Sequence, residues 1–178
     1  DGKEGFYIPL GHTHAAKQLT RNEVLNTLVP LFKDNKIKKY GHDLKTMLVF
    51  LADLAVDMQT AEDIMLAAYL LNPARNSYEI AELSWEYLHK QVSSPNEVAG
   101  GKGKVYPMAL VPIDKMTAYA GQRADAIFEL APVMEAELKK IEGKKRFTDK
   151  KLPFKPHFYK EQKKQEKKEP ESLWKKNI

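Results

Sequence analysis

Asp63-Ile-Met-Leu-Ala-Ala-Tyr-Leu-Leu-Asn-Pro73 is the stretch of this 178-residue chain that says most about its fold. Its apolar residues recur at helical spacing, and Asn72-Pro73 is typical of a helix end. A second helix is predicted directly after it, from Ser77 to Leu88, because apolar residues return at helical intervals. Tyr69, Trp85 and Tyr87 fit the apolar faces of these helices, and we expect them to lie in the core. We expect the same of the methionines of the chain.

Toward the N-terminus, strands and helices are predicted to alternate. Phe6-Tyr-Ile-Pro-Leu10 is aromatic and β-branched, which favours a strand. Thr20 stands three residues before Glu23, the spacing of a capping box, and indicates a helix that runs to about Phe32. The remaining expected elements are a strand at 36–40 ending at Gly41, a helix that follows an N-cap at Asp43, and a short strand at 56–58.

Toward the C-terminus, a long irregular connection and a long helix are expected. Residues 93–112 hold three Gly and three Pro, which is typical of a loop. The helix is predicted from Ile113 to Glu142, with a kink or interruption near Pro132. An order of strand, helix, strand, helix, short strand and then mostly helices is typical of an α/β fold with a small sheet.

Charge divides the chain into two parts. The sequence carries 29 Lys and Arg against 24 Asp and Glu, a formal net charge of +5. Residues 144–178 hold 13 of the basic and 5 of the acidic residues, which gives +8 there and −3 over residues 1–143. The basic character therefore belongs to the C-terminal segment, not to the body. We predict a domain over residues 1–143 and a Lys-rich, extended tail over residues 144–178.

Composition excludes several classes of protein. The chain has no cysteine, which excludes a disulfide scaffold, a thiolate metal site and a Cys nucleophile. No apolar run approaches the roughly 20 residues that span a bilayer, so we expect no membrane partner. The first residues carry no signal-peptide pattern. We therefore expect an intracellular location, in the cytoplasm, the nucleoid or an organelle matrix.

Three segments together resemble the 3′–5′ exonuclease domain of family A DNA polymerases, the DNA polymerase I type. They are Gly41-His-Asp-Leu-Lys45, Asp63–Pro73 and Tyr119-Ala-Gly-Gln-Arg-Ala-Asp125. The family carries Asn-Leu-Lys-Tyr-Asp, then Asp-Thr-Met-Leu-x-x-Tyr-Leu-Leu-x-Pro, then Tyr-Ala-x-Glu-Asp-Ala-Asp. Residues 6–10 are similar to its second strand, and Gly101-Lys-Gly-Lys104 to the loop before its last helix. The resemblance implies an α/β, ribonuclease H-like 3′–5′ exonuclease fold, apparently lacking its first strand, with a basic C-terminal extension.

The resemblance also shows where catalytic carboxylates would fall. The family hydrolyses phosphodiesters with two Mg²⁺ or Mn²⁺ ions, which are hard cations that need oxygen ligands. By the resemblance, its second carboxylate falls on Met47 and its third on Arg123, Tyr119 is retained, and the first pair would precede Asp1. A thioether does not replace a hard oxygen ligand, and Arg brings a fixed positive charge. The resemblance therefore implies degenerate catalytic positions at Met47, Tyr119 and Arg123, with no catalytic residue, metal or cofactor.

Other residues offer weaker candidates for a site. Asp125 is rotated by about 200° around a helix from Arg123, so it is expected to face elsewhere. Asp43 is better explained as the N-cap of the helix that follows it than as a metal ligand. His12 and His14 can share a metal at their spacing, but no third ligand is evident and a surface loop explains them better. The glycine-rich run at 100–104 lacks the phosphate-loop pattern and is interpreted as a flexible connection.

The tail is the other candidate for function. Its first part mixes basic and aromatic residues, which is the combination that binds a phosphate backbone and stacks on bases. Over residues 160–171 Lys and Glu interleave, and a solvated extension explains that part equally well. The predicted nucleic-acid-binding residues are Lys144, Lys145, Arg146, Lys150, Lys151, Lys155, Phe158, Tyr159 and Lys160.

Three functions follow from these observations. The first is a catalytically inactive exonuclease-like domain with a structural or binding role, similar to the vestigial proofreading domain of some DNA polymerases I. The second is a non-catalytic subunit of a larger nucleoprotein assembly, such as an organellar ribosome, that binds RNA, DNA or protein subunits through its basic tail. The third, an active metal-dependent exonuclease, needs a first strand and substitute ligands.

Overall fold

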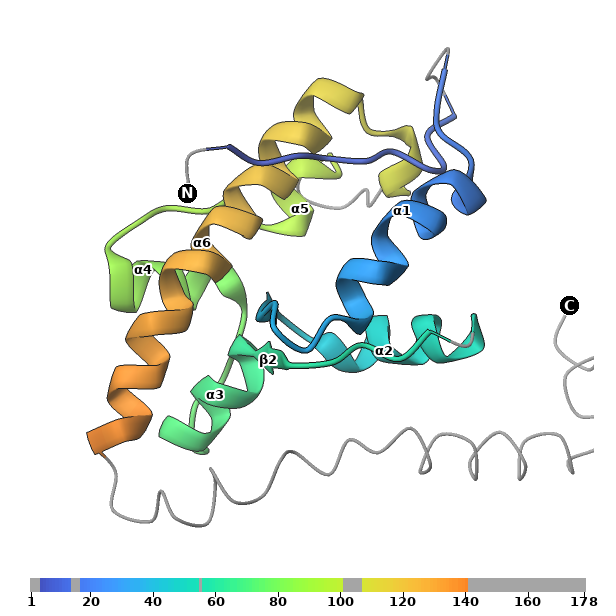
Figure 1. Cartoon of the computed structure of the whole chain (residues 1–178). Helices are drawn as coiled ribbons and strands as arrows, with labels where there is room; N and C mark the ends of the chain where they lie inside the picture. The colour runs from blue at the N-terminus through green and yellow to red at the C-terminus, as the bar shows by residue number, and fades with distance from the viewer. Residues whose placement is uncertain (1–3, 14–16, 55, 101–106, 141–178) are drawn as a thin grey trace, which may run out of the picture.

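The computed structural model describes residues 4–13, 17–54, 56–100 and 107–140 of the chain (Figure 1). Most of the described residues are helical, and the predicted helices are confirmed within a few residues at their ends. In chain order the elements are α1 (Arg21–Lys33), β1 (Lys39–Gly41), α2 (Leu44–Asp53), β2 (Ala61–Asp63), α3 (Ile64–Leu71), α4 (Ile80–Leu88), α5 (Pro95–Val98), the 3₁₀ turn η1 (Met108–Leu110) and α6 (Ile113–Lys140).

The two strands form a parallel pair linked by a helix. Lys39 lies opposite Ala61 and Gly41 opposite Asp63 in this ladder, with α2 as the crossover. A parallel pair needs such a crossover, because a tight turn reverses the chain direction. The long helix α6 packs against β1, α3 and α4. The small parallel sheet with its helices confirms the predicted α/β fold.

Two of the predicted strands are wrong. Residues 6–10 and 56–58 have no strand structure, and the second strand lies later, at Ala61–Asp63. The N-terminal segment passes beside α6 (Figure 1). It is held by hydrogen bonds near η1, where the backbone N–H and hydroxyl of Thr13 both donate to the carbonyl of Ala109. The aromatic and β-branched residues of 6–10 therefore do not form a strand paired with another strand.

The first helix begins where its capping box predicts. The Thr20 hydroxyl accepts a hydrogen bond from the Glu23 backbone N–H at 3.3 Å, and the Thr20 N–H donates to the Glu23 carboxylate at 2.7 Å. The Thr20 N–H and then the Thr20 hydroxyl, which donates to the same carboxylate at 2.8 Å, lower the pKa of Glu23. Neither proline stops its helix: Pro30 lies inside α1, and α6 continues through Pro132 to Lys140.

The start of α2 corrects the predicted cap. Asp43 occupies the N-cap position, but its backbone is left-handed (φ 54°) and its side chain caps nothing. Asp63, at the end of the neighbouring strand, supplies the cap instead. Its carboxylate accepts hydrogen bonds from the N–H groups of Asp43 and Leu44 at 3.2 and 2.9 Å, and from Met65 at 2.9 Å. One carboxylate thus satisfies the N-termini of both α2 and α3, an arrangement that a helix start favours.

Two apolar clusters hold the domain together. The larger one joins α3, α4 and α6, and the smaller one joins α2, residues 56–58 and the inner face of α1. The strand residue Tyr40 packs on the larger cluster and makes an edge contact with Phe128 of α6 at 6.5 Å between ring centres. The largest fully buried side chains are Ile80, Leu83, Leu130, Met134 and Ser84.

Not all aromatic residues are in the core, and here the prediction was wrong for two of them. Tyr69 is 48% exposed and Trp85 is 63% exposed, whereas Tyr87 is half-buried. The buried face of α4 consists of Ile80, Leu83 and Ser84. Trp85 lies about 100° around the helix from Ser84 and so falls outside that face.

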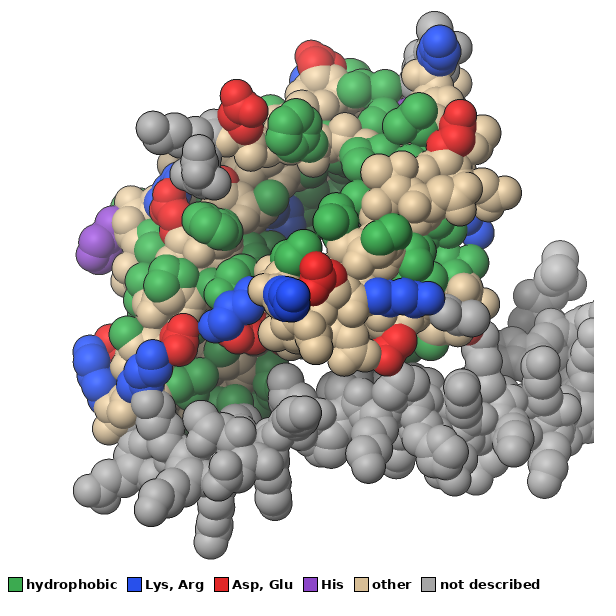
Figure 2. Space-filling view, viewed as in Figure 1, with side chains coloured by type: hydrophobic (Ala, Val, Ile, Leu, Met, Phe, Trp, Pro, Cys, Tyr) green, Lys and Arg blue, Asp and Glu red, His purple; other side chains and the backbone are tan. Residues whose placement is uncertain are grey.

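Further hydrophobic side chains remain on the surface. Figure 2 shows them gathered around a hollow between α6 and α1. The large ones that are at least one-third exposed in the N-terminal segment and in α1, α2 and α6 are Phe6, Ile8, Leu10, Leu31, Met47, Phe50 and Phe128. Among the described residues, no helix is both long and apolar enough to cross a membrane.

Candidate functional site

Tyr119 and Arg123 lie one turn apart on α6, and the structure brings them together. The Arg123 guanidinium carbon is 5.5 Å from the centre of the Tyr119 ring, in a cation–π contact. Both residues are half-buried. Arg123 forms no ion pair with any carboxylate in the part of the chain that the structure describes. The cation is therefore held by an aromatic face on its own helix.

Asp125, two residues later, is directed elsewhere, as its helical rotation predicts. Its carboxylate forms an ion pair with Lys90, which follows α4, and the same ammonium contacts Glu129 at 3.1 Å. Hydrogen bonds to Asp125 and then to Glu129 raise the pKa of Lys90. One lysine thus joins the end of α4 to two acidic residues, one turn apart, on α6.

Met47 lies apart from these residues. It sits in the first turns of α2 with its side chain 38% exposed. Figure 1 shows α2, the helix that carries Met47, to the right of β2 and α6 to its left. The carboxylates near the start of α2 are already engaged: Asp63 accepts three backbone N–H groups, and Asp43 accepts the hydroxyl of Thr46 at 3.1 Å.

Acidic and histidine side chains do not gather elsewhere in the described ranges. No three residues among His, Asp and Glu lie close enough there to hold one metal ion. Among the same residues, none of the buried side-chain nitrogen or oxygen atoms lacks a hydrogen-bond partner.

His12 was expected in a surface loop, and that expectation was wrong. It is buried, and its Nδ1 donates to the carbonyl of Val111 at 3.0 Å, because a carbonyl can only accept. Its Nε2 then accepts from the Tyr7 hydroxyl at 2.6 Å. Burial raises the pKa of Tyr7. His12 is thus a structural link between the N-terminal segment and Val111, in the short connection between η1 and α6. His14 lies outside the described residues.

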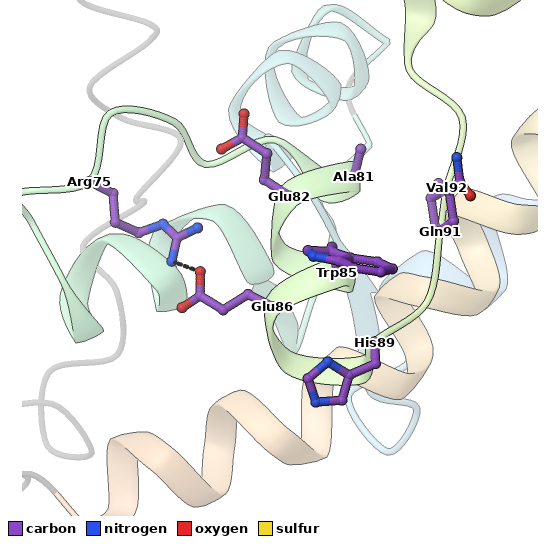
Figure 3. Close-up of a pocket in the computed structure, with 8 residues that line it drawn as sticks. All are labelled: Arg75, Ala81, Glu82, Trp85, Glu86, His89, Gln91 and Val92. Atoms are coloured by element: carbon purple, nitrogen blue, oxygen red, sulfur yellow. Dashed lines mark hydrogen bonds and ion pairs between the residues drawn. The ribbon is translucent and has the colours of Figure 1, made fainter.

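A groove on α4 was missed by the sequence reasoning. Figure 3 shows Trp85 at its centre, with the ion pair of Arg75 and Glu86 on one side and His89 below it. The sequence offered one signal for this groove. Trp85 does not follow the spacing of the buried residues of α4, so an exposed Trp could have been predicted there.

The predicted nucleic-acid-binding residues lie outside the described residues, which end at Lys140. This holds for Lys144, Lys145, Arg146, Lys150, Lys151, Lys155, Phe158, Tyr159 and Lys160, and also for the glycine-rich run at 101–104.

Comparison with known proteins places the body in one family. Residues 5–130 match the family model described as "DNA polymerase I, ribonuclease H-like domain". This range includes Met47, Tyr119 and Arg123, and it ends before the tail.

Relatives and solved structures agree with that match. DNA polymerase I of Pseudomonas aeruginosa is 28% identical over 159 residues, which cover 86% of this chain and 17% of the relative. DNA polymerase I of Rhizobium leguminosarum is 28% identical over 143 residues, 74% of this chain and 14% of the relative. The chain thus spans about a sixth of the length of these curated relatives. A structure of the Mycobacterium smegmatis Pol1 POL domain with DNA primer-template and dNTP superposes with a TM-score of 0.52 at 22% identity, covering 68% of this chain and 18% of that one.

Proposed function

This chain belongs to the family of ribonuclease H-like domains of DNA polymerase I, and we propose that it acts within that family as a non-catalytic domain with a structural or binding role. The observation that carries the proposal is the set of contacts made by the Arg123 guanidinium group. Its guanidinium is held on the Tyr119 ring and has no carboxylate partner among the described residues. A permanent cation at this position repels the metal ions that family-type hydrolysis needs.

The surrounding residues support the same proposal, because they do not fit a two-metal centre. Such a centre needs several carboxylates directed at one point. Asp125 is engaged by Lys90, and Asp63 already accepts hydrogen bonds from three N–H groups. Met47 offers a thioether, which is a poor ligand for a hard cation.

Binding of Mn²⁺ to the full chain tests this directly. We expect no saturable binding at sub-millimolar Mn²⁺, measured by electron paramagnetic resonance of the free ion, because no described group of residues offers enough oxygen ligands. A proofreading-active DNA polymerase I fragment is the positive control. Saturable binding of one or two ions by this chain, lost on adding a tenfold excess of Mg²⁺, would contradict the proposal.

A second candidate function is favoured by the division of charge. With +8 on residues 144–178 and −3 on the rest, the basic tail is the part suited to a polyanion, and the chain would serve as a subunit of a nucleoprotein assembly. Each phosphate contact releases counterions. For four to seven contacts with a single strand, the logarithm of the affinity should fall with the logarithm of salt with a slope of roughly −3 to −5.

The tail variant Lys150→Gln with Lys151→Gln tests whether these two lysines contribute to the salt dependence of binding. If both lysines contact phosphates, the slope becomes shallower by about 1.4. The matched control, Lys175→Gln with Lys176→Gln, removes the same charge outside the predicted binding residues and should change the slope less. Equal effects of the two pairs would mean that the predicted residues have no special part, and salt-independent binding would contradict the second function.

A further inference from the structure

The groove on α4 combines an exposed indole with carboxylates. It has a volume of about 820 Å³ and lies over the outer face of α4, bounded by the residues that follow the helix. Glu82, Trp85, Glu86 and His89 are three or four residues apart, so they form one continuous patch on the helix surface. Figure 3 shows the Trp85 ring in the middle of this patch.

Trp85 is not required by the core. The inward face of α4 is filled by Ile80, Leu83 and Ser84, each fully buried. Ser84 satisfies its hydroxyl by donating to the carbonyl of Lys90 at 2.8 Å. Trp85 therefore leaves 63% of its surface exposed at a place where the helix needs no further apolar contact. A large exposed aromatic side chain of this kind is typical of binding surfaces.

The charge of the groove favours a cationic occupant. Glu86 is paired with Arg75 at 2.5 Å, and the Arg75 side chain is only 11% exposed, so that cation is already neutralised. Glu82, an exposed residue that lines the groove, forms no ion pair within the described residues. An aromatic face beside such a carboxylate suits an ammonium or guanidinium group, by cation–π attraction and charge-assisted hydrogen bonds. The same carboxylates repel a phosphate backbone.

We propose that the α4 groove binds the chain's own basic segment, residues 144–160. This segment carries seven Lys and Arg and a single Asp, and it also contains Phe147, Phe154, Phe158 and Tyr159. It follows α6, and α6 packs directly against α4. Covalent connection gives the segment an effective concentration in the millimolar range, so contacts that are individually weak suffice. The proposal is independent of whether the chain binds nucleic acid.

The α4 groove and a polyanion would compete for the same basic segment. While the basic segment occupies the groove, its lysines and aromatic residues are engaged by Glu82 and Trp85. A polyanion must then displace these contacts before it can bind the same residues, so the groove would moderate binding by the tail. Both contacts weaken with salt, but only the contact with the groove depends on Trp85.

Cross-linking of the full chain tests the proposal. A zero-length carbodiimide reagent joins a carboxylate to a lysine only where the two are in contact. We expect cross-links from Glu82 or Glu86 to lysines within residues 144–160, and their loss in Glu82→Gln and Glu86→Gln variants. Asp114→Asn, in the first turn of α6, removes an exposed carboxylate far from the end of that helix and should leave these cross-links intact.

A mixture of isotope-labelled and unlabelled chains shows whether the cross-links form within one chain or between two chains. Cross-links within a single chain support the proposal. Cross-links that join labelled to unlabelled chains would assign the groove to a second copy and overturn it. Cross-links spread over other carboxylates, with no preference for Glu82 and Glu86, would also overturn it.

Fluorescence of Trp85 gives a second readout that does not depend on cross-linking. In a Trp174→Phe background Trp85 is the single tryptophan. We expect quenching by acrylamide to be about twofold weaker at low salt than at about 0.5 M salt, where the charges are screened. Neutralising Lys144, Lys145 and Arg146 to Gln should remove this protection, whereas neutralising Lys163, Lys164 and Lys167 should not. Equal quenching in all variants, or protection only after an oligonucleotide is added, would overturn the proposal.

Discussion

Lys90→Met removes the ammonium that joins the end of α4 to Asp125 and Glu129 of α6. Methionine keeps most of the length and apolar stem of the side chain, so the change removes charge with little change in packing. We expect the variant to fold and to be less stable.

The size of the loss follows from the exposure of the three side chains. Lys90, Asp125 and Glu129 are 38%, 34% and 44% exposed, so each ion pair is a surface pair that contributes about 0.2–1 kcal/mol. Without the lysine, two carboxylates four residues apart on α6 also repel each other by about 0.2–0.5 kcal/mol. Two such pairs and the repulsion together give about 0.6–2.5 kcal/mol, and the middle of that range is about 1–2 kcal/mol.

Urea unfolding at neutral pH measures this loss. With a slope of about 2 kcal/mol per M, the midpoint should fall by about 0.5–1 M. Because contact with the carboxylates raises the pKa of Lys90, the stabilisation is fully present below the ordinary value of 10.5 and is lost as pH rises through the higher folded pKa. The difference between wild type and variant should therefore stay constant from pH 7 to 9, disappear at still higher pH, and shrink in about 1 M salt.

The control is Lys115→Met, because Lys115 is exposed on α6 and pairs with no carboxylate in the described ranges. A midpoint shift no larger than that of the control would refute the ion-pair reasoning. So would a Lys90→Met loss that persists unchanged in high salt. In a double-mutant cycle, Asp125→Asn should cost less in the Lys90→Met background than alone.

Three further substitutions test the fold. Gly41→Ala places a Cβ 2.2 Å from the Leu44 side chain, which is buried and cannot move freely, so it should cost about 1–3 kcal/mol by urea unfolding. Ser84→Ala leaves the Lys90 carbonyl without its side-chain donor and should cost about 1–3 kcal/mol, whereas a loss below about 0.5 kcal/mol would mean that water replaces the hydroxyl. Thr20→Ala removes the cap of α1 and should cost about 1 kcal/mol. The Thr20 backbone N–H, the main cause of the lowered pKa of Glu23, still donates to the carboxylate, so an NMR titration should show that only the part due to the hydroxyl is lost. Since a lowered pKa stabilises the fold only above the ordinary value of 4.5, that contribution disappears as pH falls through the lowered pKa.

The helices could be predicted from sequence because their signals are local. The capping box at Thr20 and the apolar spacing of residues 64–71 are read from neighbouring residues, and the structure places α1 and α3 there. The strands could not be placed as well, because each has only three residues and its identity depends on a partner 22 residues away. Residues 6–10 have the composition of a strand but pair with no strand among the described residues, and the backbone bond to η1 comes from Thr13, which donates to Ala109.

The site was partly predictable for the same reason. The contact of Arg123 with Tyr119 joins residues four apart on one helix, which spacing alone allows. The cap that Asp63 gives to α2 depends on the register of β1 with β2, and the partner of Asp125 comes from the end of α4. Trp85 was assigned to the core because it is aromatic, although Ser84, a smaller polar residue with a local hydrogen bond, takes the buried position.

The central claim is that this member of the DNA polymerase I family is not an exonuclease, and degradation of an end-labelled single-stranded oligonucleotide tests it most directly. The full chain is incubated in stoichiometric excess with millimolar Mn²⁺, beside a proofreading-active DNA polymerase I fragment and an EDTA control. With Arg123 on the Tyr119 ring and Asp125 engaged by Lys90, we expect no shortening above the EDTA control. Stepwise shortening from the 3′ end that EDTA abolishes would contradict the account.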